Sequence, residues 1–332
     1  MSRPHIMFAI ASPSGVDPAA MDKAVCLASA LHTDLELFHC AFDSDITHPG
    51  RFATRGVQED IHGLAEQRRQ QLERHAARAR TFGVRVRSSV RWDYPTYEGI
   101  VRQVLRHQPD LLIAQSTPKG RAARLLLSQT DYKLMESCPC PLLLIKSRRP
   151  YLDPSVLAAV DPGHVHDKPA ALDQAILDSA GMISGALSGK LLVFHARTPW
   201  NDAVRATPEL RDLPEAVSDE VRAAYCDRIE DQVMELAQDH EVPRRRVHIV
   251  EGYAARVLPG VAHRELADIV AMGAVSRSPL KRALIGHTAE RVLDALDCDV
   301  LIVKPPGFSS PVRQQSAHHV ERTRYARIMT SD

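Results

Sequence analysis

Two glycines in the second half of the chain have the spacing and surroundings of a phosphate-binding loop. They stand in the pattern Gly273-x2-Ser276-x9-Gly286-His287, after an apolar run and ahead of a helical one. Glycines let backbone amides approach phosphate oxygens, and the N-terminus of the following helix supplies positive potential. Ser276 adds a side chain where close approach is needed, and His287 holds phosphate well only when it is protonated. The alternative is a tight turn after a strand and a helix entry without a ligand.

Two histidines occupy matching positions in the two halves of the chain. They follow phenylalanines in the pairs Phe38-His39 and Phe194-His195, at the ends of apolar runs. The carboxyl edge of a parallel sheet is where open α/β folds bind ligands, so both are candidate ligand contacts. The alternative is a hydrogen-bonded, half-buried histidine without a ligand. No second ligand lies at a helical or strand spacing from either one, so a metal role is not favoured.

Cys138-Pro139-Cys140 precedes the apolar run Leu142–Ile145. The spacing is Cys-x-Cys, whereas thioredoxin-like redox motifs have two residues between the cysteines. Small apolar side chains suit the start of a buried strand. We therefore expect these thiols to pack in the core.

Motifs for catalysis are missing from the sequence. It contains no Gly-x-Ser-x-Gly elbow, no His-Glu-x-x-His pair and no Walker lysine after a glycine loop. We expect a protein that is not an enzyme, with slow ATP hydrolysis left open.

Charge is balanced along the 332 residues, with 42 Lys+Arg against 41 Asp+Glu and a formal net charge of +1. Nucleic-acid-binding domains usually carry a strong basic excess, so no specific nucleic-acid partner is expected. The first half is dense in arginine around Arg68, Arg69 and Arg74, but aromatic residues are not interleaved as a stacking surface requires. These arginines are expected on a solvated helix face.

The expected location is the cytoplasm. No run approaches the roughly 18 apolar residues of a membrane span, so no membrane insertion is expected. The first apolar run, Ile6–Ala11, is followed by a turn and suits a buried strand better than a signal peptide. The six cysteines form no disulfide or zinc framework.

Short apolar runs alternate with helical patterns along the whole chain. Helical stripes end near Gly83 and Gly189, as helices often do. Strands that alternate with helices indicate βαβ units and a parallel sheet. The expected strands are Ile6–Ala11, Leu35–Cys40, Val84–Trp92, Leu111–Ala114, Leu142–Ile145, Val156–Val160, Leu191–Ala196, Val247–Val250, Ile269–Met272 and Val300–Val303.

The two halves repeat each other. Asp110-Leu111-Leu112 matches Asp268-Ile269-Val270, and the runs 140–146 and 298–304 match at the same offset of 158 residues. A constant offset with a matched order of elements indicates a duplicated α/β domain. We expect a first domain over residues 1–147, a second over 155–305 and a flexible polar tail over 306–332.

The runs 268–277, 286–293 and 298–304 resemble the end of a universal stress protein domain: a strand, a glycine loop, a helix and a closing strand. The duplication resembles the tandem members of that family. The resemblance implies two tandem domains of the adenine-nucleotide alpha-hydrolase-like fold. Each would be a five-stranded parallel sheet with helices on both faces, and the two would pack as an internal pseudo-dimer.

The same resemblance implies a nucleotide site in the second domain. Adenine-nucleotide-binding members carry Gly-x2-Gly-x9-Gly-Ser/Thr, and an acidic residue after the first strand contacts the nucleoside. This chain keeps the spacing but has serine and histidine at two of the positions. The implied contacts are Asp161, Gly273, Ser276, Arg277, Gly286, His287 and Thr288.

The first domain lacks this pattern. Gln115, Pro118 and Ser128 stand at the three glycine positions, and Ala11 stands at the acidic position. A nucleotide is therefore not expected there in the family's manner.

Three functions remain open. The first is a non-enzymatic stress-response protein of the tandem universal stress type that senses or holds a small ligand. The second is an adenine-nucleotide binder, with ATP or ADP in the second domain. The third is a carrier of an apolar or amphipathic small molecule, because a degenerate glycine loop leaves the crevice free of phosphate. No cofactor is established by the sequence.

Overall fold

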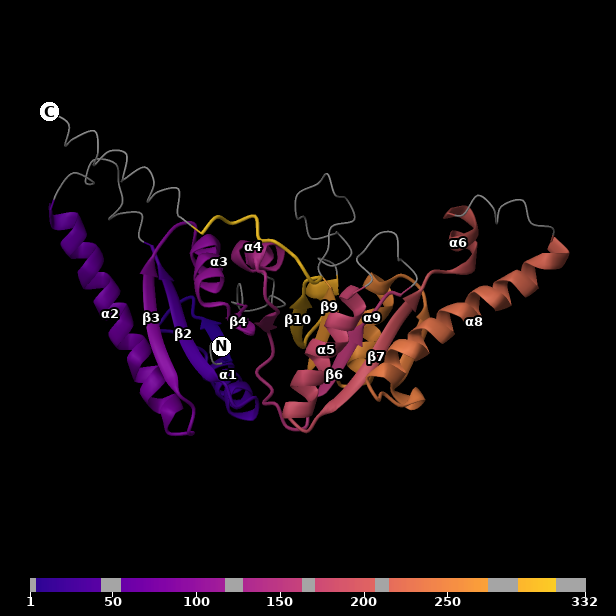
Figure 1. Cartoon of the computed structure of the whole chain (residues 1–332), viewed down its shortest axis with the longest axis horizontal. Helices are drawn as coiled ribbons and strands as arrows, with labels where there is room; N and C mark the ends of the chain where they lie inside the picture. The colour runs from indigo at the N-terminus through magenta and orange to yellow at the C-terminus, as the bar shows by residue number, and fades with distance from the viewer. Residues whose placement is uncertain are drawn as a thin grey trace, which may run out of the picture. The chain divides into compact units, whose positions relative to one another are not determined.

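The computed structural model describes residues 4–42, 55–116, 128–162, 171–206, 215–273 and 292–314 (Figure 1). The described residues form two compact units. Unit 1 holds those up to 116, those from 128 to 150 and those from 308 to 314, and unit 2 holds those from 151 to 307. The expected domain boundaries, the tail and the pseudo-dimer stay predictions.

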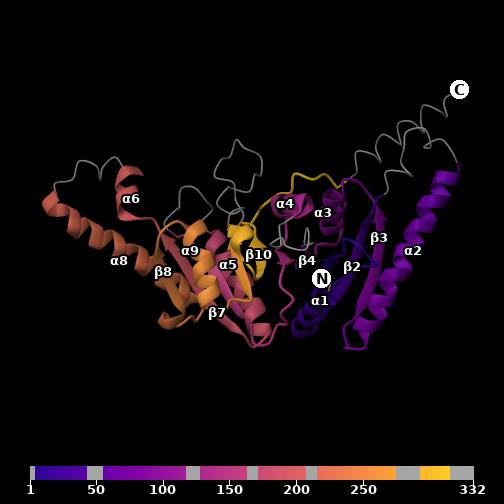
Figure 2. The same cartoon turned by 180° about the vertical axis from the view of Figure 1, so that it is seen from behind.

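Unit 1 is a parallel sheet with the strand order β3-β2-β1-β4-β5. With right-handed crossovers, this order places α1 and α2 on one face and α3 and α4 on the other, where α3 and α4 pack together (Figure 2). The elements are β1 (His5–Ala9), α1 (Pro18–Ala30), β2 (Asp34–Ala41), α2 (Arg55–Arg80), β3 (Val86–Trp92), α3 (Thr96–His107), β4 (Leu111–Gln115), α4 (Gln129–Ser137) and β5 (Leu142–Ile145).

Unit 2 repeats this order as β8-β7-β6-β9-β10, again all parallel. Its elements are β6 (Ser155–Ala159), α5 (Ala171–Ala186), β7 (Lys190–Arg197), α6 (Trp200–Ala206), α8 (Glu215–Asp239), η1 (Arg244–Arg246), β8 (Val247–Glu251), α9 (Ala254–Arg264), β9 (Ile269–Gly273) and β10 (Asp299–Val303). The expectation of two tandem α/β domains with parallel sheets is confirmed.

The central strands are buried on both faces, which explains why they read as continuous apolar runs. Every residue of β1 and β5 is buried. The outer strands β3 and β8 are half-buried and carry polar residues instead. Phe8, Phe38 and Phe194 are the largest fully buried side chains.

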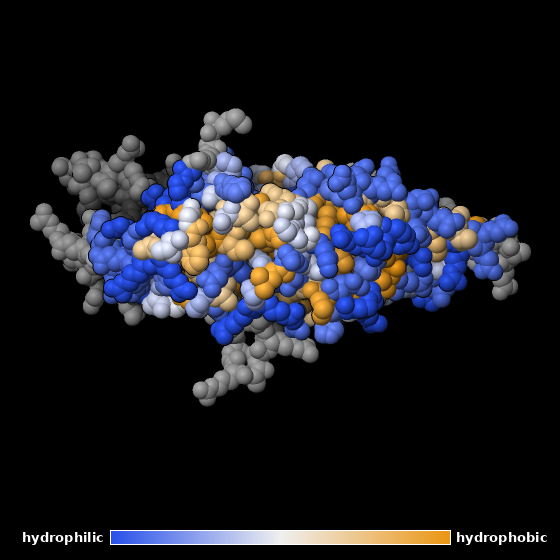
Figure 3. Space-filling model, turned by 90° about the horizontal axis from the view of Figure 1, so that it is seen from below, coloured by the Kyte–Doolittle hydropathy of each residue, from blue (hydrophilic) through white to orange (hydrophobic). Residues whose placement is uncertain are grey.

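Hydrophilic and hydrophobic residues are interspersed over the face shown in Figure 3. No helix of the described part of the chain combines the length and the apolar character that a membrane crossing needs.

Two helix caps shape the loops that leave the sheet of unit 1. Asp17 caps α1, where its carboxylate accepts a hydrogen bond from the backbone N–H of Ala19, and Pro18 follows. Ser128 and Asp131 form a reciprocal capping box at the start of α4. Both helices start close to the carboxyl edge of the sheet.

Gly189 directly precedes β7 and lies close to the backbone of Pro154. A Cβ atom at this position would lie 2.2 Å from the carbonyl oxygen of Pro154. Gly185, in the last turn of α5, has nothing within 4 Å of the same atom. The two glycines therefore form a matched pair.

We predict that Gly189→Ala destabilises the protein by about 2–3 kcal/mol, because a backbone atom has to move to admit the methyl group. Gly185→Ala should instead add about 0.5–1 kcal/mol, since alanine loses less entropy in a helix. Urea denaturation of both variants checks this. Equal effects would mean that the backbone around Pro154 adjusts freely.

Candidate functional site

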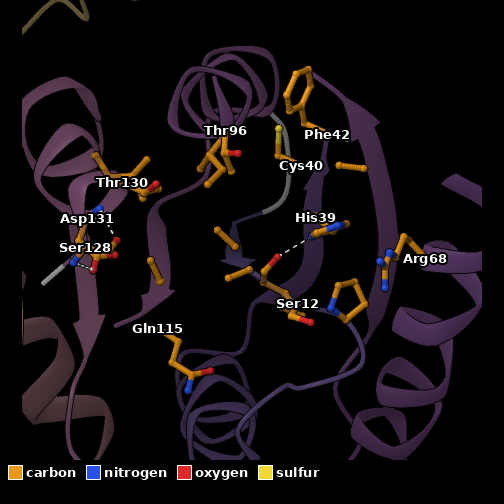
Figure 4. A pocket seen from close by; sticks show the side chains of 18 of the residues that line it. Ser12, His39, Cys40, Phe42, Arg68, Thr96, Gln115, Ser128, Thr130 and Asp131 are labelled. Atoms are coloured by element: carbon orange, nitrogen blue, oxygen red, sulfur yellow. Dashed lines mark hydrogen bonds between the residues drawn. The ribbon is translucent and has the colours of Figure 1, made fainter. Parts of the chain in front are cut away.

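Unit 1 holds a cavity of about 460 Å³ at the carboxyl edge of its sheet (Figure 4). Its walls come from the ends of β1, β2 and β4, the loop after β1, the first turns of α3 and α4, and one face of α2. This edge is a topological switch point, because the chain leaves β1 toward β2 and leaves β4 toward β5 on the opposite side. Open α/β sheets bind ligands at such points.

The cavity lining is rich in hydrogen-bonding groups. It includes the hydroxyls of Ser12, Thr96, Ser128 and Thr130 and the amide of Gln115. These groups come from four different elements and loops, and Figure 4 shows them around one space. Apolar side chains fill the rest of the wall: Ile10, Phe42, Leu64, Ile100 and Leu134.

His39, one of the two histidines expected at a sheet edge, lines this cavity. Its Nδ1 lies 2.8 Å from the carbonyl oxygen of Ile10, which can only accept, so Nδ1–H is the donor. Burial lowers the pKa of His39 despite that bond, and the nearby Arg68 lowers it further. The ring is therefore neutral at pH 7 and leaves Nε2 as an acceptor.

Arg68 brings positive charge to the cavity from α2. It is half-buried, and one guanidinium N–H donates to Gln71 Oε1 at 3.2 Å. Among the ion pairs of the described residues, none includes Arg68. The expectation of a solvated arginine face on this helix does not hold for Arg68, which lies four residues from both Leu64 and the buried Leu72.

Asp131 is the acidic residue of the cavity lining, and its carboxylate takes part in the cap of α4. Oδ2 accepts the backbone N–H of Ser128 at 2.7 Å, and the Asp131 N–H donates to Ser128 Oγ at 3.1 Å. The hydroxyl of Ser116 lies 3.5 Å from the same carboxylate oxygen. Asp131 thus holds the start of α4 in place.

In unit 2 the structure brings together two residues expected at a nucleotide site, Asp161 and Gly273, and the histidine expected as a ligand contact, His195. Asp161 follows β6, and His195 lies near the end of the neighbouring strand β7. Asp161 Oδ1 is 3.9 Å from His195 Nδ1. His195 Nδ1–H donates to the carbonyl oxygen of Val160 at 3.0 Å. Gly273 ends β9, which pairs with β6. All three lie at the same edge of the sheet.

Gly273 also has a packing role that needs no ligand. A Cβ atom there would lie 2.7 Å from Cδ2 of Leu172, on the helix α5 that covers β9. The sequence alternatives were a phosphate loop and a tight turn, and close helix–strand packing is a further reason for this glycine. Ser276, Arg277, Gly286, His287 and Thr288 lie outside the described residues, so their roles stay predictions.

In the described ranges, no group of three or more His, Cys, Asp or Glu side chains is placed to hold a metal ion. At the carboxyl edge of unit 2, Asp161 and His195 form a pair of such groups, 3.9 Å apart.

The profile of the Universal stress protein family matches residues 3–146 and 154–304. The chain belongs to the universal stress protein family. Both halves of this universal stress protein are matched separately, in agreement with the repeat seen in the sequence.

Relatives named universal stress protein E match nearly the whole chain. Universal stress protein E of Photorhabdus laumondii is 25% identical over 312 residues, which are 92% of this chain and 97% of the relative. Universal stress protein E of Escherichia coli K12 is 24% identical over 309 residues, which are 92% of this chain and 96% of the relative.

Solved structures extend this likeness to the fold. A functionally unknown protein from Pseudomonas aeruginosa PAO1 has a TM-score of 0.68 at 25% identity, covering 92% of this chain and 93% of its own. A putative universal stress protein from Pseudomonas aeruginosa UCBPP-PA14 has a TM-score of 0.66 at 25% identity, covering 92% and 94%.

Sequence reasoning looked for a site in unit 2 and missed the cavity of unit 1. His39 was expected at a sheet edge, but Ser12, Thr96 and Thr130 are far apart in the chain. Nothing in the sequence therefore indicated that they line one cavity. A signal for Arg68 was present, since an arginine between two leucines at helical spacing stands on a buried face.

We predict that His39 makes folding stability fall below pH 6.5. Its pKa is lowered in the folded state, so the unfolded chain takes up a proton first as the pH falls. The contribution is fully present above the unfolded pKa of about 6.5 and is lost below it, by at most about 1.4 kcal/mol per pH unit.

His39→Gln should accordingly lose less stability than the unchanged protein between pH 7.5 and 5.5, although it is less stable at pH 7.5. Urea denaturation at the two pH values measures the difference. Parallel pH profiles would contradict a neutral, buried His39.

Proposed function

We propose that this universal stress protein is a non-enzymatic stress-response protein that holds a small polar anion in the cavity of unit 1. The observation that carries the proposal is that cavity, with hydroxyl groups and Arg68 around one space. A volume of about 460 Å³ falls within the range of small-molecule sites, roughly 300–1,000 Å³.

The charge of the lining supports an anion. Arg68 has no carboxylate partner among the described residues, and His39 beside it is neutral. The Asp131 carboxylate lies on the opposite wall and is used by the cap of α4, so the Arg68 side of the cavity is the side that favours an anion (Figure 4). A guanidinium pairs well with a carboxylate or a phosphate group. The hydroxyls of Ser12, Thr96 and Thr130 suit a ligand that carries hydroxyl or carbonyl groups.

The same lining disfavours a nucleoside triphosphate. Gln115 and Ser128 place side chains where the family's nucleotide binders have glycines, and the Asp131 carboxylate lies beside Ser128. A triphosphate there would meet the negative charge of the Asp131 carboxylate. The polar lining also favours a polar ligand over an apolar cargo.

The hydrogen bonds of the cavity support holding over catalysis. The Nδ1–H of His39 is used by the Ile10 carbonyl, and Asp131 is used by the cap of α4. The hydroxyl of Ser12 bonds to that of Ser14 at 3.2 Å. These contacts differ from the nucleophile–base–orienter chain of a hydrolase. Six free cysteines support a reducing location such as the cytoplasm.

Native mass spectrometry of the protein purified from its own host tests this proposal. We expect a co-purified mass of a small anion, and we expect Arg68→Gln to reduce its occupancy at least tenfold, since a charge-assisted bond is worth about 1.5–3 kcal/mol. Arg69→Gln is the matched control, because Arg69 is exposed and pairs with Glu66.

A ligand retained equally by both variants would place the binding site elsewhere. A ligand-free protein that also binds no anion from a panel of carboxylates and sugar phosphates would contradict the proposal.

A second candidate function is adenine-nucleotide binding by unit 2, favoured by Asp161, His195 and Gly273 at one sheet edge. We expect at most one ATP per chain, bound about tenfold more weakly by Asp161→Asn, which loses a charged acceptor. Asp239→Asn, at the end of α8, is the control. Substitution of Gly273 is unsuitable as a test because it disturbs the contact with Leu172.

Isothermal titration with ATP and magnesium measures this binding, and labelled ATP measures turnover. We expect turnover below about one per minute, against roughly 1–1000 per second for typical enzymes. Two equivalent sites, or binding that is unchanged by Asp161→Asn, would overturn the assignment.

A further inference from the structure

Two thiols are in direct contact between α4 and β5. Cys138 follows the last residue of α4, Cys140 stands two residues later, and their sulfur atoms are 3.6 Å apart. Both cysteines are reduced in the structure. Core packing was expected for both, and it holds for Cys138, which is buried, whereas Cys140 is only half-buried.

The backbone fixes this contact. Cys138 caps the C-terminus of α4, and its N–H donates to the carbonyl oxygen of Leu134 at 2.8 Å. Its backbone is extended, with φ −72° and ψ 126°. Pro139 and Pro141 restrict the chain on both sides of Cys140. The two thiols are therefore held together by main chain that has little freedom to separate them.

We propose that Cys138 and Cys140 form a site of reversible oxidation, at which hydrogen peroxide converts the two thiols into an intramolecular disulfide. The proposal does not depend on the ligand of the unit 1 cavity. It rests on the contact between the sulfur atoms and on the rigid Cys-Pro-Cys-Pro segment.

The chemistry balances with peroxide as the oxidant. The sulfur of Cys140 attacks one peroxide oxygen, the O–O bond breaks, and a sulfenic acid and one water form. The sulfur of Cys138 then attacks the Cys140 sulfur, the S–O bond breaks, and a second water leaves. Two thiols and one peroxide thus give one disulfide and two waters. The sulfur atoms must approach from 3.6 Å to about 2.05 Å.

The rate should depend on pH. The hydrogen bond to Cys138 and burial raise the pKa of Cys140, so little thiolate is present at neutral pH. Cys40 competes poorly, because burial raises its pKa to about 12 and its Sγ donates to the carbonyl oxygen of Asp93 at 3.4 Å. Oxidation should therefore be slow at pH 7 and faster by up to about tenfold per pH unit above it.

Oxidation would act on the helix that borders the cavity. Thr130, Asp131 and Leu134 of α4 line the cavity, and Leu134 also accepts the hydrogen bond from Cys138. A disulfide would tie the end of this helix to the segment that enters β5. The oxidant would thus be sensed next to the cavity, at the opposite end of α4 from the capping box.

The test treats the full-length protein with hydrogen peroxide at pH 7 and pH 8.5, alkylates the remaining thiols and digests with trypsin. Cleavage after Lys133 and Lys146 releases Leu134–Lys146, which contains Cys138 and Cys140 and no other cysteine. We expect this peptide to escape alkylation and to lose two hydrogen atoms, about 2 Da, with both changes reversed by dithiothreitol.

Variants sharpen the result. Cys138→Ser and Cys140→Ser should each abolish the loss of two hydrogens, whereas Cys26→Ser, on α1, should leave it unchanged. A peptide that stays doubly alkylated, that carries only sulfinic acid on Cys140, or that is linked to another cysteine would overturn the proposal. The measurement on the unsubstituted protein decides the matter even if a variant fails to fold.

Discussion

In each unit, the main-chain carbonyl that follows the first strand is buried and bonds to a histidine of the neighbouring strand. This bond holds the carboxyl edge of the sheet together. Ile10 and Val160 are buried, and their N–H groups bond to the second strand at Phe38 and Phe194. Their carbonyl oxygens need a donor, since an unpaired buried carbonyl costs about 1–3 kcal/mol. His39 and His195 supply it through Nδ1–H. This one bond fixes the tautomer and the orientation of each ring and ties the ends of two strands together.

The two units place different chemistry on this shared frame. In unit 1 the edge opens into a cavity with hydroxyl groups and an arginine from α2. In unit 2 the acidic Asp161 stands beside the histidine, and Gly273 admits Leu172 of α5 close to β9. The frame tolerates such differences because the buried strands carry the stability, while the residues that follow them at the sheet edge are free to vary. The duplication therefore repeats the scaffold, while the described residues at the two edges differ.

The element order could be predicted because the strands are buried on both faces. Such strands read as apolar runs, and Leu142–Ile145 matches β5 at both ends. The bounds of the edge strand β3 were harder to predict, because the polar run Arg87-Ser88-Ser89 interrupts its apolar pattern. This strand begins at Val86 rather than at the expected Val84. At an edge, pairing with one neighbour replaces burial as the determinant, and the sequence pattern weakens accordingly.

The sequence by itself determined the duplication, the parallel α/β fold, the family and the matching histidines, because each of these depends on local pattern or on a constant offset. Tertiary structure alone decided which residues share a cavity. Ser12, Arg68 and Thr130 meet only because three crossovers return the chain to one edge of the sheet. It also decided that Gly273 faces Leu172 and that the thiols of Cys138 and Cys140 touch. Contacts between side chains depend on how the helices pack over the sheet. The periodicity of a sequence shows which face of an element is buried, but not which side chains of distant elements touch.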